Sequence, residues 1–493
     1  MPNDFPIPSL APLAPELFLL AAACILLLAD LWIPKDRKGI TGYIALGIVV
    51  VAAALTLLQF GDPAVTTFAA RTGAQGMVVI DTFSNVFKII LYGATILTIL
   101  IGMDFLEAEK QHHGEYYVLL LFALLGLMFM VSANDLLVVY LGLELSALSI
   151  YVLVGYFREE KRSTEAALKY FVLGSLASGF VLYGMSLIYG ATGATMLPSI
   201  AAAIGGFEGH HLILSFGLVF FLAGFLFKIS AAPFHMWTPD AFEGAPTPIT
   251  AFMAVAPKAA ALAVMMRVLV DALPSMSDQW SSILMVVAVL TMFVGNVAAI
   301  AQTSVKRMLA YSSIAHIGFA LLGLVAANEL GYMSVVLYMV VYLLMNFGAF
   351  GGLIMLRRGQ ISGEKLDDFS GLAAERPGVG LMLLILFFSL AGVPPTVGFI
   401  GKLYPILAVV QAGHIYVAVL AVLASVIGAF FYLRVVWYIY FNKPEVKFEN
   451  VNLSPAMAGV IGLSAVTVLW FGIAPSTLVT LSTAAVNGGL ILP

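Results

Sequence analysis

Runs of about 20 mainly apolar residues recur along the whole of this 493-residue chain. A helix of that length rises about 30 Å, which is the thickness of the hydrocarbon core of a bilayer. Hydrophobic residues make up 61% of the chain and charged residues only 10%, so a water-soluble fold would have too little polar surface to cover its core. The sequence therefore predicts an all-α polytopic membrane protein.

The apolar runs predict about 14 transmembrane helices. They lie near residues 16–33, 40–60, 81–103, 115–133, 135–156, 166–190, 212–244, 248–270, 280–301, 306–327, 331–356, 379–411, 414–441 and 455–476. The first run lacks a basic n-region and a small-residue cleavage site, so we expect a retained helix and not a removed signal peptide. Cys24 is the only cysteine, which excludes an internal disulfide and a cysteine-ligated iron–sulfur cluster within this chain.

Most of the 23 lysine and arginine residues lie in loops that follow odd-numbered spans. The loops on the other side carry only Arg71 and, at a helix end, Arg267. Basic loops stay on the inner face of a membrane, so both termini are expected on the outer face. The formal net charge of -4 is small and does not point to a nucleic acid partner.

Ionisable residues lie inside several predicted spans, where each is costly unless it has a partner or a function. Glu144 is about ten residues into its span, a rise of roughly 15 Å that brings it near the midplane. Lys258 and His316 reach a similar depth in their own spans, and Lys228 and Lys402 lie beside two helix breaks. The sequence therefore predicts a buried layer of polar side chains.

Each candidate residue also has a structural interpretation. Glu144, Lys228 and Lys402 could form ion pairs that are purely structural. Lys258 could serve the local backbone beside Pro257, and His316 could merely satisfy a hydrogen bond. His235 lies in the first break and could be a gate or a cap on freed carbonyls. We interpret Lys88 as snorkelling toward an interface and Arg434 as an anchor in an aromatic belt. The adjacent histidines at 112–113 and 210–211 lack a fixed third ligand, so no metal site is predicted.

Two of the spans are interrupted by proline, at Pro233 in the seventh and at Pro394 in the twelfth. Backbone groups freed at such breaks cannot face lipid, so we expect the breaks to face protein or internal water. Because the breaks are five helices apart, helices 4–8 and 9–13 predict two inverted five-helix repeats. The predicted domains are residues 1–114 (three helices), 115–270 (first repeat), 271–441 (second repeat) and 442–493 (helix 14).

Four stretches carry a family resemblance: FKISAAPFHMWTPDAFEGAPTPITAF, LGLELSALSIYVL, SVKRMLAYSSIAHIGF and SLAGVPPTVGFIGK. Together they resemble the subunit N family of proton-pumping NADH:quinone oxidoreductase, respiratory complex I, whose members are antiporter-like membrane subunits. The resemblance covers essentially the whole chain. WTPDAFEGAPTP is closer to the N type than to the L and M types, Lys402 resembles the L and N types, and the long C-terminal extension expected of L is missing.

The resemblance implies a membrane-arm subunit that translocates protons, driven by quinone reduction elsewhere in the complex. Glu144 and Lys228 match the helix-5 and helix-7 pair, Lys258 the connecting lysine and Lys402 the lysine near the outward exit, while His316 falls on the central hydrophilic axis. It implies no cofactor in this chain, with FMN, iron–sulfur clusters and quinone in partner subunits. M-type and K-type subunits are the expected neighbours, in lipid of a bacterial inner membrane or, less expected, a mitochondrial one.

A mechanism follows from elementary electrostatics. A carboxylate near a buried lysine favours its charged form, so a change in the Glu144–Lys228 separation would load and release a proton. We hypothesise that the proton passes from Lys228 through Lys258 and His316 toward Lys402. Two alternatives remain, a subunit of a multi-subunit cation/proton antiporter and a purely structural membrane-arm subunit.

Overall fold

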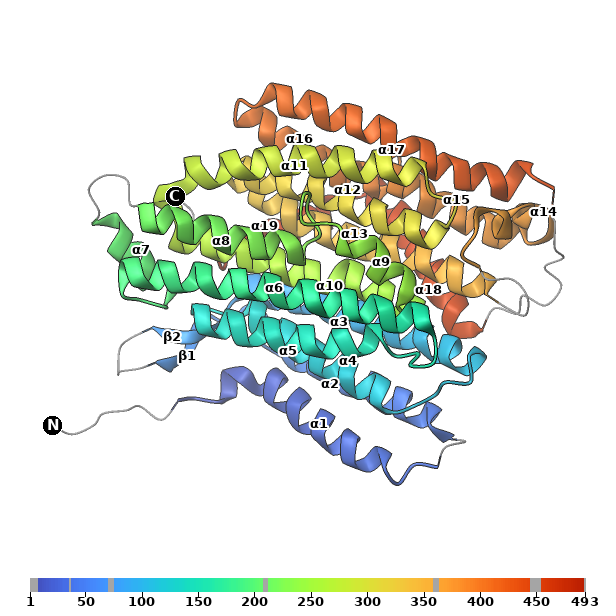
Figure 1. Ribbon diagram of the computed structural model, residues 1–493, viewed down its shortest axis with the longest axis horizontal. Coiled ribbons are helices and arrows are strands. Elements are labelled where there is room, and N and C mark those ends of the chain that lie inside the picture. The colour runs from blue at the N-terminus through green and yellow to red at the C-terminus, as the bar shows by residue number, and fades with distance from the viewer. Residues whose placement is uncertain are drawn as a thin grey trace.

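The apolar runs fold into long helices that lie side by side along one common direction (Figure 1). This computed structural model describes residues 8–34, 37–69, 75–206, 212–357, 363–443 and 454–491. The helices that coincide with the predicted spans are α1 (Ala14–Asp30), α2 (Gly39–Leu58), α3 (Thr82–Ala108), α4 (Glu115–Val131), α5 (Leu136–Val154), α6 (Lys161–Thr192), α8 (Leu212–Lys228) with α9 (Trp237–Gly244), α10 (Thr247–Met266), α11 (Ser277–Ile300), α12 (Val305–Val325), α13 (Glu329–Leu356), α15 (Pro377–Ala391) with α16 (Val397–Gln411), α17 (Ile415–Phe441) and α18 (Pro455–Ile473).

The predicted membrane class is confirmed by the lengths of these helices. Within the described ranges, 11 helices are long and apolar enough to cross a membrane, and four shorter apolar helices accompany them. Among the shorter ones, α8, α15 and α16 belong to the two spans that were predicted to be broken.

Several short elements were not predicted. Between α2 and α3 the chain forms an antiparallel hairpin of β1 (Val65–Ala69) and β2 (Gly76–Ile80), with Val65 opposite Ile80. The added helices are α7 (Leu197–Gly205), α14 (Leu372–Glu375) and α19 (Ser476–Asn487). Strands and helices of this length give too short a pattern to stand out beside runs of about 20 apolar residues.

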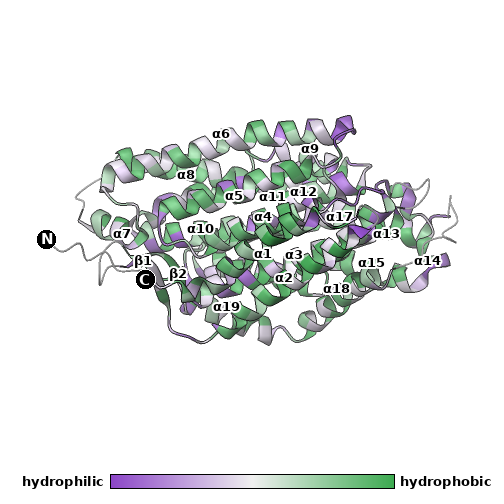
Figure 2. Cartoon of the chain, turned by 90° about the horizontal axis from the view of Figure 1, so that it is seen from below, coloured by the Kyte–Doolittle hydropathy of each residue, from purple (hydrophilic) through white to green (hydrophobic). Residues whose placement is uncertain are grey.

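The two ends of the bundle differ in chemistry. The hairpin and α7 lie at one end, which we call the hairpin end, and α14 lies at the other (Figure 1). This second end carries Lys38, Arg162, Arg307 and Arg357, all at the ends of helices, and we call it the basic end. Hydrophilic stretches gather at both ends, whereas the middle of the bundle is mostly hydrophobic (Figure 2). This is the distribution that a bilayer requires of a spanning bundle.

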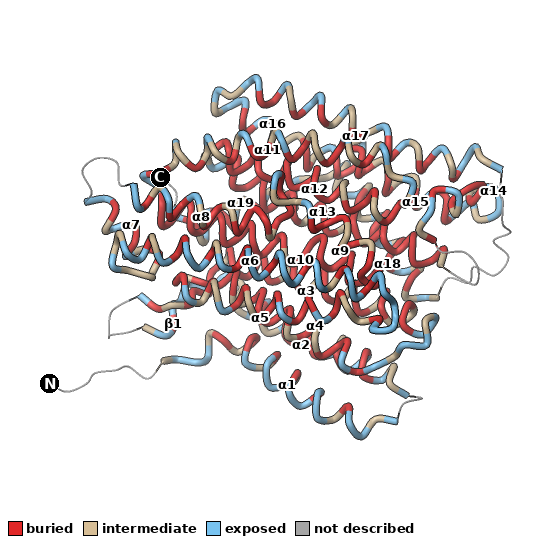
Figure 3. The backbone as a smooth tube through the Cα atoms, viewed as in Figure 1, coloured by how far each residue is buried: buried red, intermediate tan, exposed pale blue. Residues whose placement is uncertain are grey.

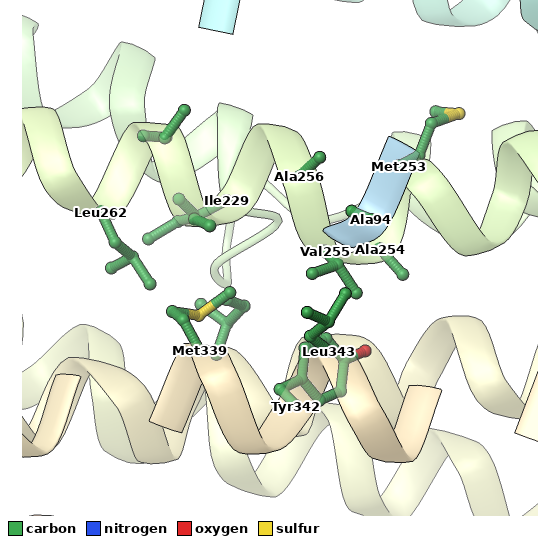
Figure 4. Packing of buried hydrophobic residues seen from close by; sticks show 14 of the residues in the cluster. Ala94, Ile229, Met253, Ala254, Val255, Ala256, Leu262, Met339, Tyr342 and Leu343 are labelled. Atoms are coloured by element: carbon green, nitrogen blue, oxygen red, sulfur yellow. The ribbon is translucent and has the colours of Figure 1, made fainter. Parts of the chain in front are cut away.

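The centre of the bundle is formed by α10, α12 and α13, which are buried almost along their whole length (Figure 3). Helices that are apolar on all sides belong inside a bundle, and those at its rim expose an apolar face. Met339, Tyr342 and Leu343 of α13 lie across from Val255 and Leu262 of α10 (Figure 4). Lys258 and His316 therefore lie on helices at the centre of the bundle.

Both predicted breaks are present. Between α8 and α9 the backbone turns at Ser230, whose φ is 65°, and the Ala232–Pro233 peptide is cis. Between α15 and α16 it turns at Gly392, whose φ is 85°, and the Pro394–Pro395 peptide is cis. The broken helix is the fourth in each predicted repeat, and the first two helices pack together in both, α4 on α5 and α11 on α12.

Both breaks are only partly enclosed by this chain, since Pro394 and Pro395 in the second are exposed and the first is exposed at Pro233. Ser230 to Ala232 is buried, and the amide of Ala232 donates to Thr291 Oγ1 at 2.9 Å. Pro233 and Met236, however, are exposed at the surface of the subunit, Met236 to 76%. The expectation that the breaks face protein or internal water therefore holds within this chain only for the buried part of each break.

Candidate functional site

Lys258 is fully buried in the middle of α10. Its Nζ donates to Ser313 Oγ at 2.9 Å and lies 5.6 Å from the centre of the Phe242 ring. Among the described residues no carboxylate forms an ion pair with it. The ammonium is therefore held by a neutral hydroxyl group and an aromatic face, which is a cation–π arrangement.

His316 lies on α12 and is also buried. One ring nitrogen, Nδ1, is 2.6 Å from the Tyr338 hydroxyl on α13, and Nε2 is 3.0 Å from the Tyr432 hydroxyl on α17. The Tyr432 hydroxyl is in turn 2.5 Å from Ser312 Oγ. Since Ser313 and His316 are three residues apart on one helix, the contact of Lys258 and the histidine cluster share a face of α12.

Lys402 lies on α16, just beyond the second break. Its Nζ donates to the carbonyl of Ala391 at 2.8 Å and to Ser425 Oγ at 3.1 Å. The Ala391 carbonyl is the last of α15, so the lysine satisfies a backbone group that the break would otherwise leave unpaired. A Cβ atom at Gly392 would come within 2.9 Å of Lys402 Cδ, so the glycine allows this close approach.

The three residues lie around one polar axis. Ser313, which binds Lys258, lies on the same face of α12 as His316. Ser425, which binds Lys402, and Tyr432, which binds His316, are seven residues apart on α17 and therefore share a face of that helix. Each of these contacts includes a hydroxyl group, which can both donate and accept hydrogen bonds.

Lys228 and Glu144 lie apart from this axis. Lys228 ends α8, and its half-buried Nζ is 3.5 Å from the Tyr151 hydroxyl on α5. Glu144 is on the same helix as Tyr151, and its buried Oε1 has no hydrogen-bond partner among the described residues. No direct ion pair joins Glu144 and Lys228 within the described chain. Tyr151 lies beside the lysine instead.

His235 lies in the first break, half-buried beside the exposed Met236, and its Nδ1 has no hydrogen-bond partner among the described residues. It is not part of the buried hydroxyl cluster around His316. Near the end of α8, the Phe227 carbonyl accepts from the amide of Ser230 at 3.0 Å and from Trp237 Nε1 at 3.0 Å. The interpretation of His235 as a gate or as a cap on freed carbonyls stays a prediction.

The interpretation of Lys88 as a snorkelling lysine is also wrong. Its side chain is 0% exposed, and its Nζ lies 2.6 Å from Oε1 of Glu16, which is equally buried on α1. Arg434 is not simply an interfacial anchor, because its guanidinium donates to the carbonyls of Ile300 at 2.9 Å and Gln302 at 2.7 Å. It caps the C-terminus of α11, where a cation is favourable.

The histidine pairs give no metal centre within the described ranges. His112 Nε2 is 3.0 Å from the Met103 carbonyl, and no group of three or more histidine, cysteine, aspartate or glutamate residues among the described ones could hold a metal ion. His210 and His211 lie outside the described residues.

Sequence reasoning missed the hydroxyl groups that contact the lysines and His316. These are Tyr151, Ser313, Tyr338, Ser425 and Tyr432. The available signal is weak. Tyrosines near the middle of apolar spans are unusual, because a buried hydroxyl needs a partner, but which partner it finds depends on how distant helices pack.

The chain was compared with known proteins. Residues 133–428 match the family described as "NADH:quinone oxidoreductase/Mrp antiporter, TM". NADH-quinone oxidoreductase subunit N 2 of Rhizobium meliloti is 45% identical over 475 residues, which are 96% of this chain and 97% of that protein.

Two solved structures show how far the fold likeness extends. Respiratory complex I of Thermus thermophilus contains a chain that is 32% identical, with a TM-score of 0.80, covering 96% of this chain and 100% of that one. The Mrp complex of a Dietzia species contains one with a TM-score of 0.83, covering 97% of each chain, but at 20% identity this likeness shows the fold alone. The chain belongs to the subunit N family of NADH-quinone oxidoreductases.

Proposed function

We propose that the chain carries protons through the membrane arm of a bacterial NADH:quinone oxidoreductase along a path that includes Lys228, Lys258, His316 and Lys402. Quinone reduction in partner subunits drives this movement, and M-type and K-type subunits are its proposed neighbours. The observation that carries the proposal is the buried axis, in which Lys258, His316 and Lys402 each bind a hydroxyl group on a shared face of α12 or α17. Hydroxyl groups and water pass protons by exchanging donor and acceptor roles.

The proposed orientation follows from the basic end. Lysine and arginine are retained on the inner side of a membrane, so we assign the basic end to the cytoplasm and the hairpin end to the periplasm. Both termini are then periplasmic, in the inner membrane of a bacterium. The proposed division of the chain keeps the two repeats at 115–270 and 271–441, and the family match over residues 133–428 falls inside them.

Glu144 is proposed to control the protonation of Lys228. Unit charges 4 Å apart interact by about 4 kcal/mol at an effective dielectric constant of 20, and this interaction weakens as they separate. Lys228 contacts Tyr151 and not Glu144, so the carboxylate must approach the lysine during the cycle to stabilise its charged form. Outward movement of a proton against 100 mV costs about 2.3 kcal/mol, which such a change in separation supplies.

The first test removes Glu144 or Lys228. Lys228→Ala and Glu144→Ala should abolish proton pumping by the assembled complex in vesicles, whereas Lys228→Arg should keep the charge but release no proton. Normal pumping in an assembled Lys228→Ala complex would refute the proposal. Co-purification with antiporter subunits alone, and not with subunits bearing flavin and iron–sulfur clusters, would support the cation/proton antiporter instead.

The second test uses a matched pair of tyrosines. Tyr432→Phe removes the hydroxyl between Ser312 and His316, and we expect pumping to fall by about tenfold, equivalent to about 1.4 kcal/mol. Tyr92→Phe is the control, because that hydroxyl is equally buried and is bound to Thr56 at 2.9 Å, but lies outside the axis. Equal effects of the two substitutions would contradict a specific role for Tyr432.

A further inference from the structure

Asp240 and Glu243 belong to the motif that carries the family resemblance, yet neither lies on the proposed proton path. Both are on the short helix α9, at the basic end. Glu243 Oε1 is 2.5 Å from Arg162 Nη2 on α6, and Oε2 is 2.5 Å from Arg307 Nη1 on α12. Asp240 contacts the same Arg307 at 3.1 Å and Lys169 of α6 at 3.0 Å. The two carboxylates therefore join α9 to helices on both sides.

The C-terminal end of α9 is held by a third cation. Lys306, which is 2% exposed, donates to the carbonyls of Glu243 at 3.2 Å and Ala245 at 2.8 Å. A cation beside the last carbonyls of a helix is favourable. The same ammonium is 3.3 Å from Glu364 Oε1, and Arg162 also reaches Glu364 at 3.4 Å.

Charges within this ion-pair network are balanced. Its cations are Arg162, Lys169, Lys306 and Arg307, and its carboxylates are Glu165, Asp240, Glu243 and Glu364. Burial raises the pKa of Glu364, but the positive charges of Lys306, Arg162 and Arg357 lower it by more, so the pKa lies below the usual glutamate value. A helix of eight residues has almost no stability of its own, so the position of α9 depends on such contacts.

The opposite face of α9 covers Lys258. Phe242 lies between Asp240 and Glu243 in the sequence and is fully buried. The centre of its ring is 5.6 Å from Lys258 Nζ. Its carbonyl accepts from Thr250 Oγ1 of α10 at 2.9 Å. On the network side lies a cavity of about 120 Å³ lined by Arg162, Lys169, Asp240 and Glu243, among others. The helix thus separates a polar cavity at the basic end from a buried ammonium group.

We propose that Asp240 and Glu243 are positioning residues, which hold α9 closed over Lys258 and so control the access of water and protons to that lysine from the basic end. This inference rests on the proposed function, because it takes Lys258 to be a proton carrier. Some members of the network are partly exposed, so its ion pairs can break and form again and thereby release and hold α9. Arg162 is 52% and Glu243 24% exposed in their side chains, and partly exposed ion pairs are individually weak.

The position of α9 can be measured by the labelling of a buried cysteine. Ala254 is fully buried on α10, four residues from both Thr250 and Lys258, and therefore on the face that α9 covers. In the assembled complex with Cys24→Ser, an Ala254→Cys thiol is exposed to a membrane-impermeant thiol reagent on the basic side, and labelling of this chain is followed by mass spectrometry. We expect Glu243→Gln to raise the labelling rate by about tenfold, which corresponds to about 1.4 kcal/mol.

Two further variants make the test specific. Glu243→Asp keeps a carboxylate and should restore slow labelling. Glu109→Gln is the matched control, because Glu109 pairs with Arg357 at 2.8 Å at the same end but does not touch α9. If the Glu243→Gln complex does not assemble, Asp240→Asn provides the same measurement.

A measurement of proton pumping shows whether the position of α9 affects transport. In versions that retain Ala254, Glu243→Gln should lower the number of protons pumped per NADH while electron transfer continues, because Lys258 then exchanges protons with the basic side throughout the cycle. Unchanged labelling, or faster labelling with unchanged pumping, would overturn the inference. Normal pumping in Lys228→Ala would instead refute the proposed function, and the labelling result would still report whether Glu243 holds α9.

Discussion

The buried ion pair between Glu16 and Lys88 gives the sharpest prediction about stability. Both side chains are 0% exposed, and Nζ and Oε1 are 2.6 Å apart. At that separation and an effective dielectric constant of 20, the attraction is about 6 kcal/mol. It is opposed by the removal of two charges from water, which costs several kcal/mol for each ion, so the pair as a whole contributes little net free energy of unfolding.

Removal of one partner has a much larger effect than removal of both. Glu16→Gln or Lys88→Met leaves one uncompensated charge in the core, and we expect each to lower the free energy of unfolding by about 3–5 kcal/mol. The double variant Glu16→Met/Lys88→Met strands no charge and keeps apolar bulk, so its change should be within about 1 kcal/mol. The pair is therefore expected to show strong coupling in a double-mutant cycle.

The measurement is equilibrium unfolding of the purified chain in mild detergent, for the wild type, both single variants and the double variant. An additive result, in which the double variant loses as much as the two single variants together, would refute the reasoning. It would mean that the side chains act through packing and not through their opposite charges.

Three further predictions concern other charged groups. Arg267→Ala should lower the free energy of unfolding by about 3–5 kcal/mol in the same assay, because it strands Asp81, which the arginine binds through both oxygens at 2.8 Å. The pKa of Glu364 is lowered in the folded state, so its carboxylate stabilises the fold at pH values above the unfolded pKa of about 4.3. The difference in free energy of unfolding between the wild type and Glu364→Gln should therefore be constant from about pH 8 to 5 and disappear as the pH falls through the folded pKa. Lys402→Arg should abolish pumping in assembled vesicles, whereas Lys88→Arg, judged by the same assay, should not.

Much of the fold was readable from the sequence because each signal was local. Apolar runs predicted the spans, and prolines at 233 and 394 predicted the breaks, since proline removes a backbone donor wherever it stands. The depth of Lys258 and His316 followed from counting residues along one helix. The hairpin of β1 and β2 was missed because five-residue strands leave only a short alternating pattern.

The partners of the charged residues were not readable, because each lies on a helix distant in sequence. Lys258 finds Ser313, and Lys402 finds Ser425. Glu16 was noted only as the beginning of the first span, so Lys88 was left without its carboxylate. Such contacts depend on how helices rotate and cross, and one sequence contains no direct record of that.

The buried lysines differ in what their partners would lose if the proton left, and this difference separates a carrier from a structural lysine. A neutral Lys88 would leave the Glu16 carboxylate unpaired in the core, at a cost of about 3–5 kcal/mol. The partners of a neutral Lys402 would be the Ala391 carbonyl and the Ser425 hydroxyl, neither of which is charged. The hydroxyl can rotate and donate a hydrogen bond to the amine. Lys258 has the same freedom through Ser313. A lysine whose neighbours are neutral can lose and regain its proton without stranding a charge, as proton transfer requires.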